Sequence, residues 1–341
     1  MTTDQLYTRE APYLAEVLER TPEGHCFSLR LSIDPEIGYV PGDSVGILPK
    51  NDPERLSQTA ALLNCPPELL EAKSIQHVTG KFLRFVRPFA KNLEEIDLLI
   101  REGRITDRFI PLWEILESCE SVPAQECLDN LSPLLPRFYS IASANAQNAI
   151  DLLISKTEMP SWRGEVLPGL CTDYLEMRAE IGTPNVPLYL HRAEHFRLPE
   201  DPHADIIMIG PGTGVAPFRA FLHARAELPG RNWLFFGARH EASDFYFEQE
   251  FRALESAGRL KLTTAFSRDA DRKVYVQHRI REEADALWQW LNGGAYLYIC
   301  GDAKRMAREV VEVLSQIACE RGRPNFFKEL KASCRMALDV Y

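Results

Sequence analysis

Residues 204–222, ADIIMIGPGTGVAPFRAFL, decide the fold of the C-terminal part of this chain. Residues 206–209 form an unbroken apolar run, which is typical of a strand buried on both faces of a parallel sheet. Three glycines follow within the next five residues, so the backbone can turn sharply and approach a ligand. Pro217 suits the first turn of a helix. A strand, a glycine turn and a helix N-terminus together predict a binding site for a phosphate group.

The segment after this loop alternates between strand and helix patterns. Strands are predicted at 233–237, 261–266 and 296–300, and helices at 246–256, 276–290 and 304–319. Such alternation predicts a parallel, doubly wound α/β sheet. The glycine spacing departs from the common G-x-G-x-x-G pattern because the third glycine comes one residue early. An ordinary glycine turn in an α/β protein is therefore the alternative interpretation.

The N-terminal part has the pattern of a β-rich domain interrupted by helices. Residues 26–33 and 43–48 alternate between apolar and polar side chains, which predicts either a β-hairpin or a small barrel. A helix is predicted from Asp52 to Leu63, and residues 68–135 have a helical pattern that indicates an insert. Strand patterns resume at 136–143. We predict two domains, at residues 1–200 and 201–341.

Composition excludes several classes of protein. The chain has 341 residues and a formal net charge of −10, which argues against a nucleic-acid partner. It contains no run of eighteen apolar residues and no N-terminal signal pattern, so no membrane partner is expected. Its eight cysteines form no C-x-x-C pair and are expected to be reduced thiols in the cytoplasm. His191 and His195 stand four residues apart without an evident cysteine or carboxylate partner, so no metal site is expected.

Eight motifs, in order along the chain, resemble the reductase part of the diflavin NADPH reductases, within the ferredoxin–NADP reductase superfamily. They are RFYSIAS (137–143), GLCTDYL (169–175), MIGPGTGVAPFRAFL (208–222), NWLFFGAR (232–239), AFSRD (265–269), KVYVQ (273–277), YICGDAKRMA (298–307) and LDVY (338–341). The sulfite reductase flavoprotein branch is the most similar because it also ends in Asp-Val-Tyr. The resemblance implies an antiparallel FAD-binding barrel with a helical insert, followed by an NADP-binding domain.

The resemblance implies an FAD site in the barrel domain. Arg137 can form a bidentate pair with the pyrophosphate, and Tyr139 can stack on the isoalloxazine ring. Thr172 is expected to cap a short helix whose first amides face a second phosphate. A surface salt bridge for Arg137 and a core position for Tyr139 are the alternatives from the residues alone. The full predicted FAD set is Arg137, Phe138, Tyr139, Ser140, Gly169, Leu170, Cys171, Thr172 and Tyr341.

NADP rather than NAD is predicted from charge. NAD sites usually carry a carboxylate after the second strand, whereas here that strand ends in FFGAR, with Arg239. A second polar loop follows the next strand and matches the family's 2′-phosphate positions, although a solvated basic loop is the alternative. The predicted NADP set is Gly212, Thr213, Gly214, Arg239, Ser267, Arg268, Lys273, Tyr275, Gln277 and Asp302.

Three residues are predicted to be catalytic by resemblance: Ser140, Cys300 and Asp339. They would orient the nicotinamide and stabilise developing charge without forming a covalent bond, because hydride transfer is the chemistry of the cofactors. A buried, inert cysteine is the alternative for Cys300. The chain departs from the family at 155–158, where SKTE replaces the aromatic residue that often covers the FAD adenine, and Trp162 is a candidate substitute.

These features predict an enzyme that oxidises NADPH and passes electrons singly to a separate acceptor. The sequence starts where the barrel should start, so the family's FMN-binding domain is expected to be missing. The expected acceptor is a flavodoxin-like FMN protein or a sulfite reductase haemoprotein. A non-catalytic partner subunit and a nucleotide sensor are the alternatives, and the three predicted catalytic residues argue against the first of them.

Overall fold

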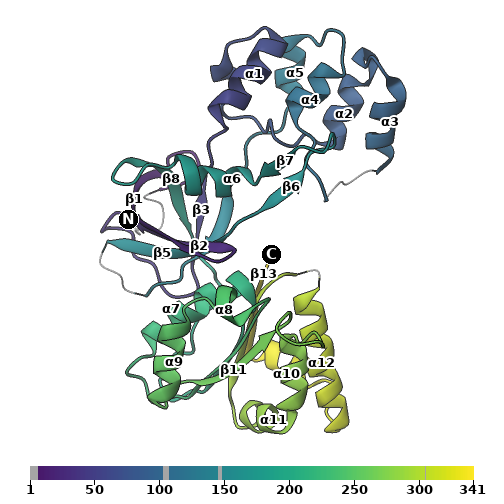
Figure 1. The fold of residues 1–341 in the computed structure, drawn as a ribbon. Helices are drawn as coiled ribbons and strands as arrows, with labels where there is room; N and C mark the ends of the chain where they lie inside the picture. Colours follow the sequence, from purple (N-terminus) through teal and green to yellow (C-terminus); the bar gives the residue numbers. More distant parts are fainter. Residues whose placement is uncertain (1–6, 103–106, 145–147, 304) are drawn as a thin grey trace.

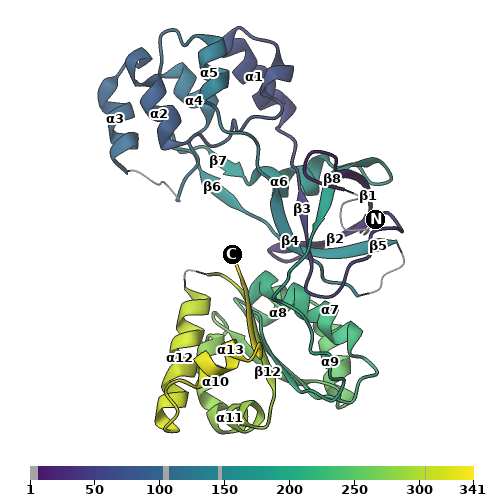
Figure 2. The same ribbon diagram turned by 180° about the vertical axis from the view of Figure 1, so that it is seen from behind.

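The computed structural model describes residues 7–102, 107–144, 148–303 and 305–341. Figure 1 shows three masses: a helical lobe, an antiparallel β-barrel next to it, and an α/β part on the other side of the barrel. The end of the chain lies between the barrel and the α/β part, as the view from behind also shows (Figure 2). The predicted fold, a barrel with a helical insert followed by a doubly wound parallel sheet, is confirmed.

The barrel is a six-stranded antiparallel sheet in the order β4-β3-β8-β1-β2-β5. A bridge between Ile141 and Leu152 joins its two outer strands and closes it. The predicted strand regions at 26–33 and 43–48 do not pair with each other, so the hairpin interpretation is wrong and the barrel interpretation is right. The strands are β1 (Tyr13–Glu23), β2 (Cys26–Ser32), β3 (Ser44–Ile47), β4 (Arg137–Ser140), β5 (Ala149–Ser155) and β8 (Pro184–His191).

The helical lobe has a core of its own, formed mainly by leucine, isoleucine and phenylalanine side chains. Helix α1 begins after Asp52, whose carboxylate accepts a hydrogen bond from the N–H of Arg55 at 2.9 Å, and it shares this core. The β6–β7 hairpin reaches the lobe from the barrel (Figure 1). The elements are α1 (Pro53–Leu63), η2 (Pro67–Leu70), α2 (Gly80–Val86), η3 (Arg87–Phe89), α3 (Leu93–Glu102), α4 (Leu112–Glu117), α5 (Ala124–Asn130), β6 (Glu158–Pro160) and β7 (Val166–Pro168).

The α/β part contains a five-stranded parallel sheet in the order β11-β10-β9-β12-β13. Among the strands of this sheet, β9 comes first along the chain and β12 comes fourth, yet the two are neighbours, so the strand order reverses between them. Helices pack on both faces of the sheet. In such sheets ligands bind outside the carboxyl ends of the strands, at the point of reversal. The strands are β9 (Ile206–Ile209), β10 (Asn232–Ala238), β11 (Lys261–Phe266), β12 (Tyr296–Gly301) and β13 (Met336–Val340).

The helices around this sheet lie where they are predicted, except that one predicted helix is divided into two. The helix predicted at 276–290 is two helices separated at Glu283, and Lys304, the predicted start of another, lies outside the described residues. The elements are η5 (Gly212–Val215), α7 (Ala216–Ala224), α8 (Glu241–Asp244), α9 (Glu248–Ser256), α10 (Val276–Glu282), α11 (Ala284–Asn292), α12 (Met306–Glu320) and α13 (Phe326–Ala332). In the described ranges no helix has both the length and the hydropathy to cross a membrane.

The barrel and the α/β part are joined by polar contacts at partly buried positions. Arg219 of α7 donates to Asp151 of β5 at 3.1 Å and to the carbonyl of Ala142 at 3.2 Å, while Glu250 of α9 accepts from the same guanidinium at 2.8 Å. Burial would lower the pKa of Arg219, but these two carboxylates raise it above its usual value. These contacts join β5 and the segment after β4 to α7 and α9 of the α/β part.

Candidate active site

Two cavities meet where the barrel faces the carboxyl ends of the parallel strands. The barrel cavity, about 570 Å³, runs along β4 and the α6 turn towards the helical lobe. The sheet cavity, about 560 Å³, lies over the carboxyl ends of β9, β10 and β11. Ser155, Thr213 and Tyr341 line both of them. Volumes of this size are typical of cofactor sites, for which the range is about 300–1,000 Å³.

The three predicted catalytic residues come together next to this junction. Asp339 of β13 lies opposite Cys300 of β12 in the parallel register. Its Oδ2 accepts a hydrogen bond from Ser140 Oγ of the barrel at 3.2 Å, and Cys300 Sγ lies 3.9 Å from the same oxygen. The cluster therefore contains groups from both the barrel and the sheet.

Gly214 brings the glycine loop into contact with this cluster. A side chain at Gly214 would collide with the carbonyl oxygen of Cys300, so only glycine allows η5 to pack against β12. Gly212, with a φ of 58°, lines the sheet cavity and has open space where a side chain would stand. Gly214 was predicted to bind the cofactor, but it does not line the sheet cavity, and its observed contact is with the neighbouring strand.

Burial sets the charge of the cluster. It raises the pKa of Asp339, while hydrogen bonds from Ser140 and Cys300 and the electrostatic interaction with nearby His191 oppose this shift. The pKa of the Cys300 thiol lies well above its usual value because of burial and the neighbouring carboxylate. Cys300 is therefore a neutral thiol that can donate a hydrogen bond but is a poor nucleophile.

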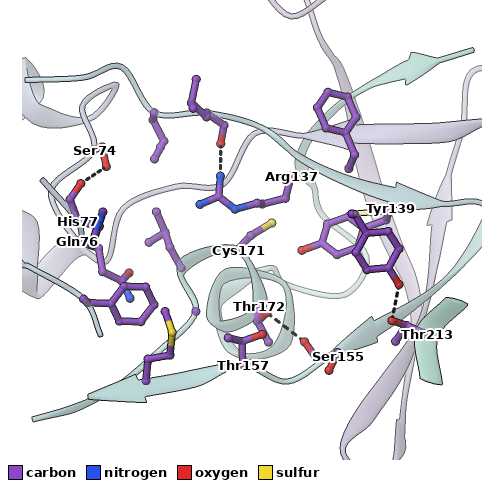
Figure 3. A pocket seen from close by; sticks show the side chains of 18 of the residues that line it. Ser74, Gln76, His77, Arg137, Tyr139, Ser155, Thr157, Cys171, Thr172 and Thr213 are labelled. Carbon is purple, nitrogen blue, oxygen red and sulfur yellow. Dashed lines mark hydrogen bonds between the residues drawn. The ribbon is translucent and has the colours of Figure 1, made fainter. Parts of the chain in front are cut away.

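The barrel cavity contains the predicted FAD residues. Figure 3 shows Arg137 in the middle of the cavity, with Tyr139 and Thr213 towards one end. Arg137 donates to the main-chain oxygen of Leu135 at 3.2 Å. Among the described residues it forms no ion pair with a carboxylate, so they do not supply the surface salt bridge that is its alternative role. The remaining predicted members, Phe138, Ser140, Gly169, Leu170, Cys171, Thr172 and Tyr341, also line this cavity.

Two details of this cavity differ from the predicted roles. Thr172 does not cap a helix: it lies within α6 (Leu170–Asp173), which begins after Gly169, and its hydroxyl donates to the carbonyl of Ser155 at 3.3 Å. A π-helical turn, η4 (Tyr174–Arg178), continues from α6. Phe138 is half exposed, and its ring packs edge-on against His191 with the ring centroids 5.0 Å apart.

The sheet cavity contains most of the predicted NADP residues. Gly212, Thr213, Arg239, Ser267, Tyr275, Gln277 and Asp302 line it, whereas Arg268 and Lys273 do not. Arg268 follows Ser267 directly, and its N–H donates to the carbonyl of Arg239 at 2.9 Å. Asp302 also has a structural role, because its carboxylate accepts from the N–H of Arg305 at 2.7 Å.

Sequence analysis missed residues that the barrel contributes to the sheet cavity. The barrel contributes His25 of the β1–β2 turn, Cys26 at the start of β2 and Lys156 after β5. They line the cavity together with Tyr246 and Arg305 of the α/β part. Because they come from strands far away in the sequence, no local pattern around the glycine loop could indicate them. The cavity therefore has walls from both parts of the protein.

Tyr341 is held in place between the two cavities. Its hydroxyl lies 2.9 Å from Thr213 Oγ1, its N–H donates to the carbonyl of Gly301 at 3.1 Å, and its carbonyl accepts from the N–H of Ala303 at 3.0 Å. The side chain is 65% exposed and reaches the cavity junction. These hydrogen bonds fix both the backbone and the ring hydroxyl of Tyr341.

Trp162 is not available as a replacement for the aromatic residue missing at 155–158. Its ring packs against the core of the helical lobe, and the Arg163 guanidinium lies 5.2 Å from the ring centroid. It does not line the barrel cavity. Within the described ranges, no three His, Cys, Asp or Glu side chains are grouped closely enough to hold a metal ion.

Comparison with known proteins agrees with this geometry. Residues 208–312, which contain the end of β9, the glycine loop and the strands β10, β11 and β12, match the oxidoreductase NAD-binding domain family. The chain is 33% identical to the sulfite reductase (NADPH) flavoprotein alpha-component of Shigella dysenteriae serotype 1, over 98% of this chain and 62% of that protein. The chain is therefore similar to this flavoprotein over almost all of its own length.

Two further relatives give the same result. The flavoprotein alpha-components of Photorhabdus laumondii and Escherichia coli K12 are 34% and 33% identical to this chain, over 98% of its length. The chain spans 62% of the length of each of these relatives. The similarity therefore extends over the barrel and the helical lobe as well as the NAD-binding domain.

Proposed function

We propose that this chain is an FAD-dependent reductase that oxidises NADPH and passes electrons one at a time to a separate protein acceptor. The observation that carries the proposal is the cluster of Ser140, Cys300 and Asp339 beside the junction of two cofactor-sized cavities. A protein that only binds a partner has no need of a barrel hydroxyl, a buried thiol and a buried carboxylate that meet at such a junction. Residues 1–200 would form the FAD domain and residues 201–341 the NADP domain.

The barrel cavity fits FAD. It is long, it contains an arginine without a carboxylate partner among the described residues, and it has the ring of Tyr139 near the junction (Figure 3). Arg137 and the first amides of α6 would bind the pyrophosphate, since helix-start N–H groups have no partner within the helix. Tyr139 would stack on the isoalloxazine, and Ser140 would donate to its reacting edge. When bound, FAD accepts two electrons as a hydride and can release them singly.

The sheet cavity fits NADPH. Arg239 supplies positive charge where an NAD site would usually have a carboxylate, and Ser267 and Tyr275 line the same region. We propose that these residues, with Arg268 and Lys273 nearby, bind the 2′-phosphate. Gly212 and Thr213 lie between this region and the junction and would contact the pyrophosphate. Asp339 and Cys300 would then lie at the nicotinamide end.

The acceptor we propose is a flavodoxin-like FMN protein or a sulfite-reductase-type haemoprotein. Support for this class comes from the relatives, whose names describe flavoprotein components of sulfite reductase. The eight cysteines are all free thiols, which supports a reducing compartment such as the cytoplasm.

The identity of the flavin tests the proposal. We expect the purified protein to be yellow and to release FAD, not FMN, when it is denatured by heat, because only FAD has the pyrophosphate that Arg137 and α6 would bind. Chromatography of the released flavin against FAD and FMN standards gives the answer. Recovery of FMN alone, or of no flavin from folded protein supplemented with FAD, would refute the proposal.

A further inference from the structure

One end of the barrel cavity lies in the helical lobe, and the residues that line this end belong to none of the eight sequence motifs. His77, in the loop before α2, and Phe109, in the segment before α4, line this end together with Met159 of β6. Figure 3 shows His77 with Gln76 and Ser74 at the end of the cavity opposite Thr213, with Arg137 between them. The cavity thus continues beyond the proposed pyrophosphate position into the lobe.

The orientation of a bound FAD follows from the two ends of the cavity. The reacting half has to lie near Ser140 and Tyr341, because only that end adjoins the sheet cavity. Arg137 lies part-way along, at the position proposed for the pyrophosphate. The adenosine half must therefore extend towards His77 and Phe109.

Phe109 supplies the aromatic surface that residues 155–158 lack. Its N–H donates to the carbonyl of Pro160 at 2.8 Å, and a parallel bridge pairs it with Ser161, so the β6–β7 hairpin fixes its backbone. Its ring is partly buried against the lobe core and still lines the cavity. Such a ring offers a base a flat surface for stacking.

His77 presents a defined hydrogen-bond donor beside this ring. Its imidazole lies edge-on to Phe109, with the ring centroids 6.4 Å apart. The N–H of Ile110 donates to Nδ1 at 3.2 Å, so the proton of the neutral ring is on Nε2. Burial lowers the pKa of His77, which favours this neutral form. Adenine carries several ring nitrogens that accept hydrogen bonds.

We propose that the helical lobe binds the adenine of FAD, with the base stacked on Phe109 and accepting a hydrogen bond from His77 Nε2. The inference rests on the proposed FAD site. It adds that contacts to the adenine contribute to the preference of the protein for FAD over FMN. It gives the lobe a ligand-binding role and explains why residues 155–158, between β5 and β6, need not include an aromatic residue.

The test compares FAD and FMN binding in the full chain. Deflavinated protein is titrated with each flavin, and binding is followed by quenching of flavin fluorescence. Phe109→Leu keeps an apolar side chain but loses the ring, and we expect it to weaken FAD binding about tenfold, as is usual for loss of base stacking, and FMN binding less than twofold. His77→Asn, which keeps an acceptor for the Ile110 N–H, is expected to weaken FAD binding selectively and by less.

Phe85→Leu is the matched control. Phe85 is partly buried against the same lobe core but does not line the cavity, so it reports damage to the lobe alone. Equal loss of FAD in the Phe85 and Phe109 variants, or equal loss of FAD and FMN in the Phe109 variant, would overturn the inference. Unchanged FAD binding in the Phe109 and His77 variants of a protein whose wild type prefers FAD would overturn it and leave the FAD proposal intact. A wild type without preference for FAD would overturn both.

Discussion

Replacing Asp339 by alanine is expected to slow the reduction of bound FAD by NADPH by about 10²-fold, as is typical when a preorganised charged group is removed from an active site. The carboxylate lies within hydrogen-bonding distance of Ser140 and close to Cys300, so it supplies negative charge where the nicotinamide becomes positive. Single-turnover stopped-flow absorbance measures this step directly. A rate within threefold of wild type would show that the cluster has no catalytic role.

The conservative variant Asp339→Asn separates charge from structure. Because burial raises the pKa of Asp339, the folded protein holds this proton more tightly than the unfolded chain does. The ionised carboxylate therefore lowers stability above that raised pKa. Asp339→Asn should accordingly melt at the wild-type temperature or above it, while flavin reduction is slow.

The pH dependence provides a second check on the same residue. The wild-type rate should decline as the pH falls and Asp339 becomes protonated, at a pH above the usual range of an aspartate because its pKa is raised. The Asp339→Asn rate should lack this decline. Asp201→Asn, which alters an exposed carboxylate between the barrel and β9, is the control and should behave as wild type.

Replacing Tyr341 by alanine is expected to raise the ratio of kcat/KM for NADH to that for NADPH by about 10²-fold. Tyr341 lines both cavities, so in the proposed complex its ring would lie where the nicotinamide has to pass. With FAD bound as proposed, the ring of Tyr341 would be covered by the isoalloxazine, and displacing it would cost about 1 kcal/mol of aromatic stacking and about 1.5–3 kcal/mol of burial. Each 1.4 kcal/mol is a factor of about ten. NADPH can meet this cost through its 2′-phosphate contacts, whereas NADH cannot.

Tyr341→Phe is the control for this effect. It keeps the ring and loses only the contact between the hydroxyl and Thr213, which lie 2.9 Å apart. The ratio should therefore stay near the wild-type value in this variant. Steady-state kinetics with both nucleotides decides the matter, and an unchanged ratio in Tyr341→Ala would rule out a gating role.

Most of the parallel sheet could be predicted from local sequence patterns. The apolar run at Ile206–Ile209 forms a fully buried strand, as its pattern predicts, and the glycine turn follows it. Cys300 lies at the end of another buried strand, at the edge of the sheet where ligands bind. The strand β13 escaped prediction because it has only five residues, several of them partly exposed, at the edge of the sheet. Its pairing opposite Cys300 is what brings Asp339 into the cluster, and no local pattern encodes that register.

In the barrel, too, some features could be predicted from local sequence and others depend on contacts between distant segments. β1 has eleven residues, but the outward-facing Leu14 and Leu18 hide the alternation that marks a strand, and a register shift between Val17 and Glu19 interrupts it further. The motif around Arg137 could be assigned from resemblance alone. Phe109 could not, because it reaches the barrel cavity only through the packing of the lobe against the β6–β7 hairpin.

Anaerobic mixing of the purified, FAD-loaded protein with NADPH tests the central claim most directly. The two cavities and the cluster beside their junction predict that one equivalent of NADPH bleaches the visible flavin absorbance, and that Asp339→Asn bleaches far more slowly. Chemical reduction with dithionite in a parallel sample shows that the flavin can be reduced. A wild-type protein that keeps its oxidised flavin spectrum with excess NADPH, while dithionite bleaches it, would contradict the account.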